Sequence, residues 1–124
     1  MKKNEEFEKY IMKIINEYIP VLLLQRHTFS LKAGCTKKDN LFECKFSYPY
    51  LNVIIGYSYS ALKDWEKEID LKEFIVHEMC HAITDPLYDK AFGRFITKNE
   101  VENEREMLTD HICNIALGIK NNEH

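Results

Sequence analysis

Residues 77–81 read His-Glu-Met-Cys-His, an HExxH motif, and this motif constrains the chain more than any other feature. Residues four apart on an α-helix lie on the same face, so His77 and His81 can bind one metal ion. A catalytic zinc ion normally has three protein ligands and leaves its fourth position to water. Glu78 follows His77 on the helix and is placed to take a proton from that water as a general base. The motif therefore predicts Zn²⁺ as cofactor and hydrolysis, most naturally of a peptide bond, as the reaction.

The segment around the motif is itself predicted to be a helix. Asp70, with Glu73 three residues later, resembles a capping box at a helix start. Apolar residues then recur with helical spacing and predict a buried stripe: Leu71, Phe74, Ile75, Met79, Ala82 and Ile83. Pro86 predicts an end at Asp85, because the residue before a proline disfavours helical geometry. Histidines in such a helix need polar partners, which either a metal ion or ordinary hydrogen bonds within the core would supply.

A third metal ligand is expected from a second helix further along the chain. Residues 97–100 read Thr-Lys-Asn-Glu, which resembles another capping box. A helical apolar stripe continues from there toward the C-terminus: Val101, Leu108, Ile112, Ile115 and Ile119. Glu104 and Glu106 are the two candidate ligands. We favour Glu106, because it alone of the two has an acid four residues later, Asp110, that could orient a metal-bound histidine.

An HExxH motif followed by a glutamate, with an aspartate four residues after that glutamate, resembles the active site of the thermolysin-like gluzincins. The resemblance implies three zinc ligands, His77, His81 and Glu106. It also implies that Glu78 is the general base and that Asp110 orients the first histidine. The residues that follow the motif, His-Ala-Ile-Thr-Asp, are similar to the family as well. The resemblance covers these two helices and not the rest of the chain.

The chain departs from that family in ways that limit what can be carried over. Arg105 stands before the glutamate, where the family usually has asparagine, and the large flanking domains are missing. The family's substrate-binding residues therefore cannot be transferred. Thr84 and Leu87 occupy the places where a metzincin has glycine and a third histidine, so that branch is disfavoured. In size and layout the chain also resembles small HExxH proteins of bacteriophages and mobile elements.

The remaining residues predict an α+β fold, and together with the resemblance they imply a minimal zincin-like domain. Residues 7–18 have the apolar spacing of an N-terminal helix. Three segments alternate apolar and polar residues with period two: 28–33, 42–46 and 53–59. Short connections predict a small antiparallel sheet, packed with the N-terminal helix, the HExxH helix and the C-terminal helix. Ser60 is expected to cap a further short helix. A chain of 124 residues suits one domain, residues 1–124, with one modest core.

Charge and composition narrow the expected partners. The formal net charge of −3, without a basic tract longer than two residues, argues against nucleic acid. The apolar run over residues 19–24 is too short to cross a bilayer, so a membrane partner is not expected either. A peptide or protein substrate remains. One hypothesis is that the strand at residues 53–59 is an exposed sheet edge that binds this substrate. The alternative is that these residues form only sheet core and cross-strand contacts. The oligomeric state stays open.

Two further expectations concern the thiols and the competing function. Four cysteines without a CxxC pair, in a chain that shows no export signal, are expected to be reduced thiols of a cytoplasmic protein. Cys80 points away from the face of the two histidines and is expected to pack in the core. The competing function is a non-catalytic module, in which the metal joins two helices and the protein acts by binding a partner.

Overall fold

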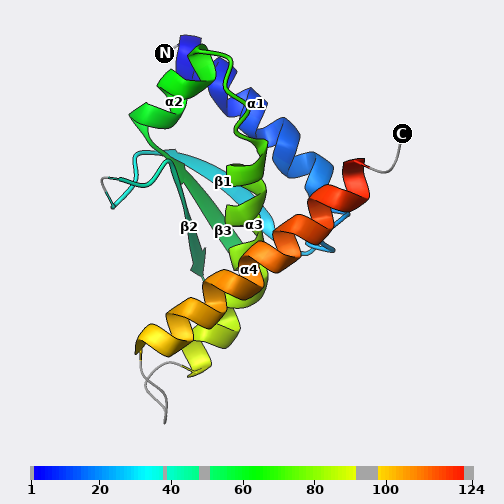
Figure 1. Cartoon of the computed structure of the whole chain (residues 1–124). Helices are drawn as coiled ribbons and strands as arrows, with labels where there is room; N and C mark the ends of the chain where they lie inside the picture. The colour runs from blue at the N-terminus through cyan, green and yellow to red at the C-terminus, as the bar shows by residue number, and fades with distance from the viewer. Residues whose placement is uncertain (1, 38, 48–50, 92–97, 122–124) are drawn as a thin grey trace.

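The computed structural model describes residues 2–37, 39–47, 51–91 and 98–121. Figure 1 shows its helices and strands, which follow one another in the order α1 (Lys2–Tyr18), β1 (Thr28–Ala33), β2 (Phe42–Ser47), β3 (Asn52–Tyr57), α2 (Tyr59–Glu66), α3 (Lys72–Ala91) and α4 (Lys98–Asn121). The predicted α+β class, with a small three-stranded sheet, is confirmed.

The sheet is mixed, so the prediction of a wholly antiparallel sheet was wrong. Its strand order is β1-β3-β2, with β3 antiparallel to β2 and parallel to β1. Gly34 follows β1 with φ +107°, a backbone conformation that glycine adopts without steric cost. The chain leaves the sheet there, and β2 forms at the far edge, with β3 inserted between the other two strands. Val53 and Ile55 of β3 are fully buried, which suits a central strand.

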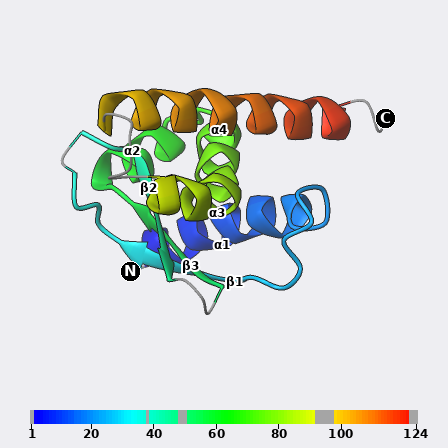
Figure 2. The same ribbon diagram turned by 90° about the horizontal axis from the view of Figure 1, so that it is seen from below.

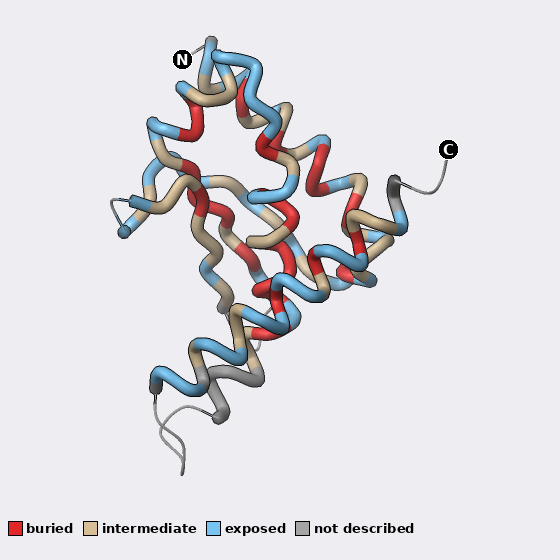
Figure 3. The backbone as a smooth tube through the Cα atoms, viewed as in Figure 1, coloured by how far each residue is buried: buried red, intermediate tan, exposed pale blue. Residues whose placement is uncertain are grey.

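Helix α3 is the centre of the packing. It contacts α1, β2, β3 and α4, and Figure 2 shows it between the sheet and α4. Buried residues are concentrated on α1, β3 and α3 (Figure 3). The largest fully buried apolar side chains of these three elements are Phe7, Ile11, Ile15, Tyr18, Val53, Ile55, Ile75, Val76 and Met79. The HExxH motif is therefore carried by the element that the rest of the fold holds most firmly.

The two helix starts of this region are capped by side chains. Before α3, the Asp70 carboxylate accepts a hydrogen bond from the Lys72 backbone N–H at 3.0 Å, as a cap residue should. Before α2, the cap is Ser58, whose hydroxyl accepts from the Ala61 N–H at 3.1 Å. The prediction of Ser60 was wrong by two residues, because the third strand ends at Tyr57 and the helix begins at once.

The predicted end of the motif helix at Asp85 was also wrong. Helix α3 continues through Pro86 to Ala91. Asp85 keeps helical geometry although a proline follows, and its carboxylate contacts His81 of the same helix and Arg105 of α4. These tertiary contacts compensate for a local preference that is only moderate. The cap predicted at Thr97 lies outside the described residues.

Helix α4 packs through a different face from the predicted apolar stripe. Among its described side chains, the buried ones are Thr109, Cys113 and Ala116. Three members of the predicted stripe are exposed: Leu108, Ile115 and Ile119. Within the described part of the chain, α4 has extensive contacts with α3 and with no other element. The face of α4 that is covered there has small side chains, which let the two helices approach closely. Among the described helices, none combines the length and apolar character needed to cross a bilayer.

We predict that Tyr57→Phe destabilises the protein by about 1–2 kcal/mol at neutral pH, because the Tyr57 hydroxyl donates a hydrogen bond to the Glu8 carboxylate. Burial, followed by this hydrogen bond to an acid, raises the pKa of Tyr57 to about 12. An unfolded tyrosine titrates near 10. The stabilisation is therefore fully present below about pH 10 and is lost as the pH rises toward 12.

Urea unfolding at several pH values measures this effect, with the exposed Tyr59→Phe as the matched control. If the wild-type protein and Tyr57→Phe lose stability equally between pH 10 and 12, the assigned contact does not contribute.

Candidate metal centre

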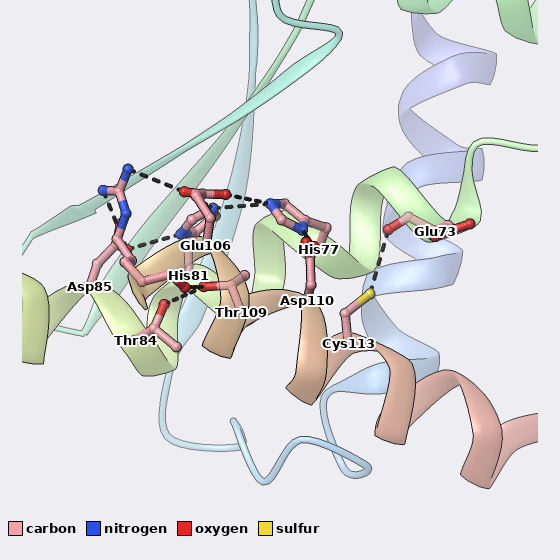
Figure 4. Close-up of polar contacts among 10 residues, drawn as sticks. Glu73, His77, His81, Thr84, Asp85, Glu106, Thr109, Asp110 and Cys113 are labelled. Carbon is pink, nitrogen blue, oxygen red and sulfur yellow. Dashed lines mark hydrogen bonds and ion pairs between the residues drawn. The ribbon is translucent and has the colours of Figure 1, made fainter. Parts of the chain in front are cut away.

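Figure 4 shows His77 and His81 side by side on α3, on the side that faces α4. Their Nε2 atoms face each other at 3.2 Å. Each Nδ1 atom has a carboxylate partner: Asp110 Oδ1 lies 2.8 Å from His77 Nδ1, and Asp85 Oδ1 lies 2.9 Å from His81 Nδ1. Both imidazole rings are thus oriented from behind by an acid.

These carboxylates decide where the imidazole protons are. A nitrogen that faces a carboxylate carries the proton, so Nδ1 is the protonated atom of each neutral ring. The two Nε2 atoms then present lone pairs to each other at 3.2 Å, an arrangement that is repulsive unless a cation lies between them. Two ligand nitrogens at about 2.0–2.1 Å from a tetrahedral ion are about 3.3 Å apart. The histidine pair therefore has the separation that one shared metal ion requires.

Glu106 of α4 supplies an oxygen to the same point. Its Oε1 lies 3.4 Å from His77 Nε2, and its Oε2 lies 3.7 Å from His81 Nε2. Glu104, the alternative candidate, is exposed, and among the described contacts it is Glu106 that reaches the imidazoles. Two imidazole nitrogens and one carboxylate are a donor set typical of catalytic zinc. The residues present fit such an ion.

Glu78 lies beside the two histidines. His77, Glu78 and His81 each contribute one potential ligand atom, and these three atoms lie within 4.8 Å of one another. The cluster could therefore hold a metal ion. The pKa of Glu78 is raised to about 7, chiefly by burial; the charge of His81 opposes this effect, and the charges of Glu106 and Asp85 add to it. A carboxyl group with a pKa near neutrality can both accept and return a proton. The residue is therefore suited to acid–base work.

The electrostatic environment favours a cation. Burial alone would lower the pKa of His81, but the hydrogen bond to Asp85 and the nearby carboxylates outweigh it, so that pKa lies above its ordinary value. Positive charge on this ring is thus stabilised by its surroundings. A divalent ion at the same place would meet the same carboxylates, which is the usual relation between a metal ion and the acids behind its histidines.

Sequence reasoning gave no site role to two of the residues here. Asp85 was interpreted as a helix end and counted in the resemblance to gluzincins, although its position four residues after His81 could have identified it as a partner of that ring. Arg105 was noted only as a departure from a known pattern. Its Nη2 lies 3.2 Å from Glu106 Oε2 and its Nη1 lies 3.9 Å from Asp85 Oδ1. No local signal identifies Arg105, because its two acids come from different helices.

Buried polar contacts hold α4 against α3. The Thr109 hydroxyl donates to the Arg105 carbonyl oxygen at 2.7 Å and lies 2.8 Å from the Thr84 hydroxyl, which must then be the donor to it. One turn further along α4, the Cys113 thiol donates to the Glu73 carbonyl oxygen at 3.8 Å. These contacts flank Glu106 and Asp110 and keep both acids opposite the histidines (Figure 4).

An open cleft of about 660 Å³ adjoins the cluster, a volume typical of small-molecule and peptide side-chain sites. His77, Glu78, Asp110 and Cys113 are among its lining residues. All four cysteines are free thiols, and Cys80 is fully buried in the core, as predicted.

Comparison of the chain with protein-family models, curated proteins and solved structures gave no match. The resemblance to gluzincins therefore rests on the residues of the two helices alone.

We predict that Asp85→Asn and Asp110→Asn each weaken the binding of a divalent transition-metal ion by about 10-fold to 100-fold, because each acid orients one imidazole. Competition with a chromogenic chelator measures the affinity. Asp64→Asn on α2 is the matched control and should bind the ion as the wild type does. Unchanged affinity in both of the first two variants would contradict the assigned orientation of the rings.

Proposed function

We propose that this protein is a zinc-dependent metallopeptidase. The observation that supports this most strongly is the convergence of two Nε2 atoms, 3.2 Å apart, and the Glu106 carboxylate from a second helix. The second is the position of Glu78 beside them, with its pKa raised to about 7 chiefly by burial. A structural metal site has no need of such a base.

In this proposal His77, His81 and Glu106 hold the ion. Zinc bound there would polarise the substrate carbonyl and allow water to be deprotonated near neutral pH. Glu78 accepts the proton from the attacking water as the water oxygen bonds to the carbonyl carbon. Glu78 then returns that proton to the peptide nitrogen as the C–N bond breaks, which yields a carboxylic acid and an amine. The base begins and ends the cycle in the same protonation state.

The other acids and Arg105 act as positioning residues. Asp110 and Asp85 fix the two rings so that both Nε2 atoms point inward. Arg105 contacts Glu106 and Asp85, and so links the two acids across the two helices. The pattern of HExxH, glutamate and aspartate resembles the gluzincins, and the place of Arg105 differs from that family.

The hypothesis that the strand at residues 53–59 binds substrate was wrong. Strand β3 pairs on both sides, with β1 and with β2, so it has no free edge for an extended peptide. Strand β2 is an edge strand, packs against α3, and begins at Phe42, which lines the cleft. We therefore propose that an extended substrate adds to β2 through main-chain hydrogen bonds.

For Glu78→Gln we expect zinc content equal to the wild type and a loss of peptide hydrolysis of about 100-fold to 10,000-fold, since the general base is removed and the ligands are kept. Metal analysis and digestion of a broad peptide library measure the two quantities. Glu104→Gln, an exposed change on α4, is the control and should keep full activity. Hydrolysis that survives undiminished in Glu78→Gln would exclude this residue as the base, and a zinc-loaded protein that cleaves nothing would favour the non-catalytic module.

The choice of third ligand has its own test. Glu106→Gln should lower zinc affinity by more than about 10-fold, because a charged oxygen donor is lost, whereas Glu104→Gln should leave it unchanged. Isothermal titration with zinc measures both. The reverse ranking of the two variants would assign the ligand to Glu104.

A further inference from the structure

The cleft continues beyond the candidate metal centre along α3. It runs from His77 and Glu78 to Glu73, in the first turn of the helix, and residues 39–42 and α4 also line it. Glu73 precedes His77 by four residues, so it lies on the same face about 6 Å away along the helix axis. A side chain adjacent to a bond held at the centre could reach this end of the cleft.

The lining of the cleft is acidic. Its carboxylates are Asp39, Glu73, Glu78 and Asp110, and neither lysine nor arginine is among the described residues that line it. Two of these acids belong to the candidate metal centre. Glu78 lies beside the histidines, and Asp110 contacts the ring of His77. Asp39 and Glu73 are exposed, and no ion pair joins either of them to another described residue. A helix dipole accounts for an acid at Glu73 but not for one at Asp39.

The cleft also has apolar walls. Leu41, Phe42 and Phe74 are among its lining residues, and each is close in sequence to Asp39 or Glu73. Phe74 is 49% exposed, although the helical pattern predicted its burial. An apolar wall that ends in carboxylates matches a side chain with a methylene stem and a cationic head. The face of an aromatic ring adds attraction for such a head.

We propose that this cleft selects peptides with a lysine or arginine side chain next to the bond to be cleaved. Leu41 and Phe74 contact the stem, and Glu73 and Asp39 bind the cationic head. The proposal deepens the metallopeptidase function and rests on it for the position of the cleaved bond. Binding of the basic side chain, however, can be measured without any turnover.

The test uses zinc-loaded Glu78→Gln and fluorescent, N-acetylated peptides in which lysine, norleucine or glutamate occupies each position in turn. Norleucine keeps an apolar stem and lacks the charge, and acetylation removes the N-terminal amine as a rival cation. At low ionic strength the best lysine peptide should bind about threefold to tenfold more tightly than its norleucine counterpart, as expected for two exposed ion pairs. Raising the salt concentration should reduce this preference.

Substitutions in the same background locate the determinants. Glu73→Gln and Asp39→Asn should each reduce the lysine preference. In the double variant, the lysine and norleucine peptides should bind with affinities within about twofold of each other. Glu73→Lys should shift the preference toward the glutamate peptide. Glu6→Gln, which removes an exposed carboxylate from α1, is the matched control and should keep the preference. Zinc content and circular dichroism verify that each variant is loaded and folded.

Equal binding of the lysine and norleucine peptides at every position would overturn the proposal, as would a lysine preference that survives the double variant. Tight binding only by peptides with a free N-terminal amine would also overturn it, since the cleft would then recognise the chain end. A wild-type protein that binds lysine peptides through Glu73 and Asp39 but cleaves none of them would refute the metallopeptidase function and leave the basic-peptide site established.

Discussion

The candidate site depends on one electrostatic constraint, the two imidazole lone pairs held face to face. Asp110 and Asp85 occupy the Nδ1 side of each ring, and the Nε2 atoms are left 3.2 Å apart. Such a pair is stable only with a positive charge between its members. Two further acids near the pair, Glu78 and Glu106, also favour a positive charge at this point. The arrangement is therefore satisfied by a metal ion shared between the rings, or by a proton on one Nε2 atom that is hydrogen-bonded to the other.

A small chain can hold this arrangement because one helix serves both the core and the site. The buried face of α3 packs on α1 and the sheet, and its other face presents the histidines to α4. Within the described part of the chain, α4 has extensive contacts with α3 and with no other element, so its position relative to α3 rests on a few buried contacts. The hydroxyl pair of Thr84 and Thr109 is the central one, since both side chains are buried and satisfy each other. Without that register Glu106 would not meet the imidazoles.

The mixed sheet has a consequence for substrate. Insertion of β3 between β1 and β2 leaves β2 as the edge strand that packs on α3. The start of β2 and the segment before it therefore form a wall of the cleft, opposite the first turns of α3. In the proposed function, the peptide backbone would bind to β2 and the basic side chain would bind to the acids of the cleft that the start of β2 lines.

The sequence by itself determined the elements and the residue types of the site. Helical spacing predicted the helix that carries His77, Glu78 and His81, and the acid four residues after Glu106 distinguished it from Glu104. These are local properties, because a spacing of four on a helix defines a face without reference to the rest of the fold. Period-two alternation likewise predicted three strands but not their order, since each strand pattern is the same whichever neighbour it pairs with.

Only the tertiary structure decided how the elements meet. The parallel pairing of β1 with β3, the continuation of α3 past Pro86 and the face through which α4 packs all depend on contacts between distant segments. The same holds for Arg105, whose two acids lie on different helices. A local preference of a few tenths of a kcal/mol to about 1 kcal/mol is outweighed when several buried contacts act on the same residue.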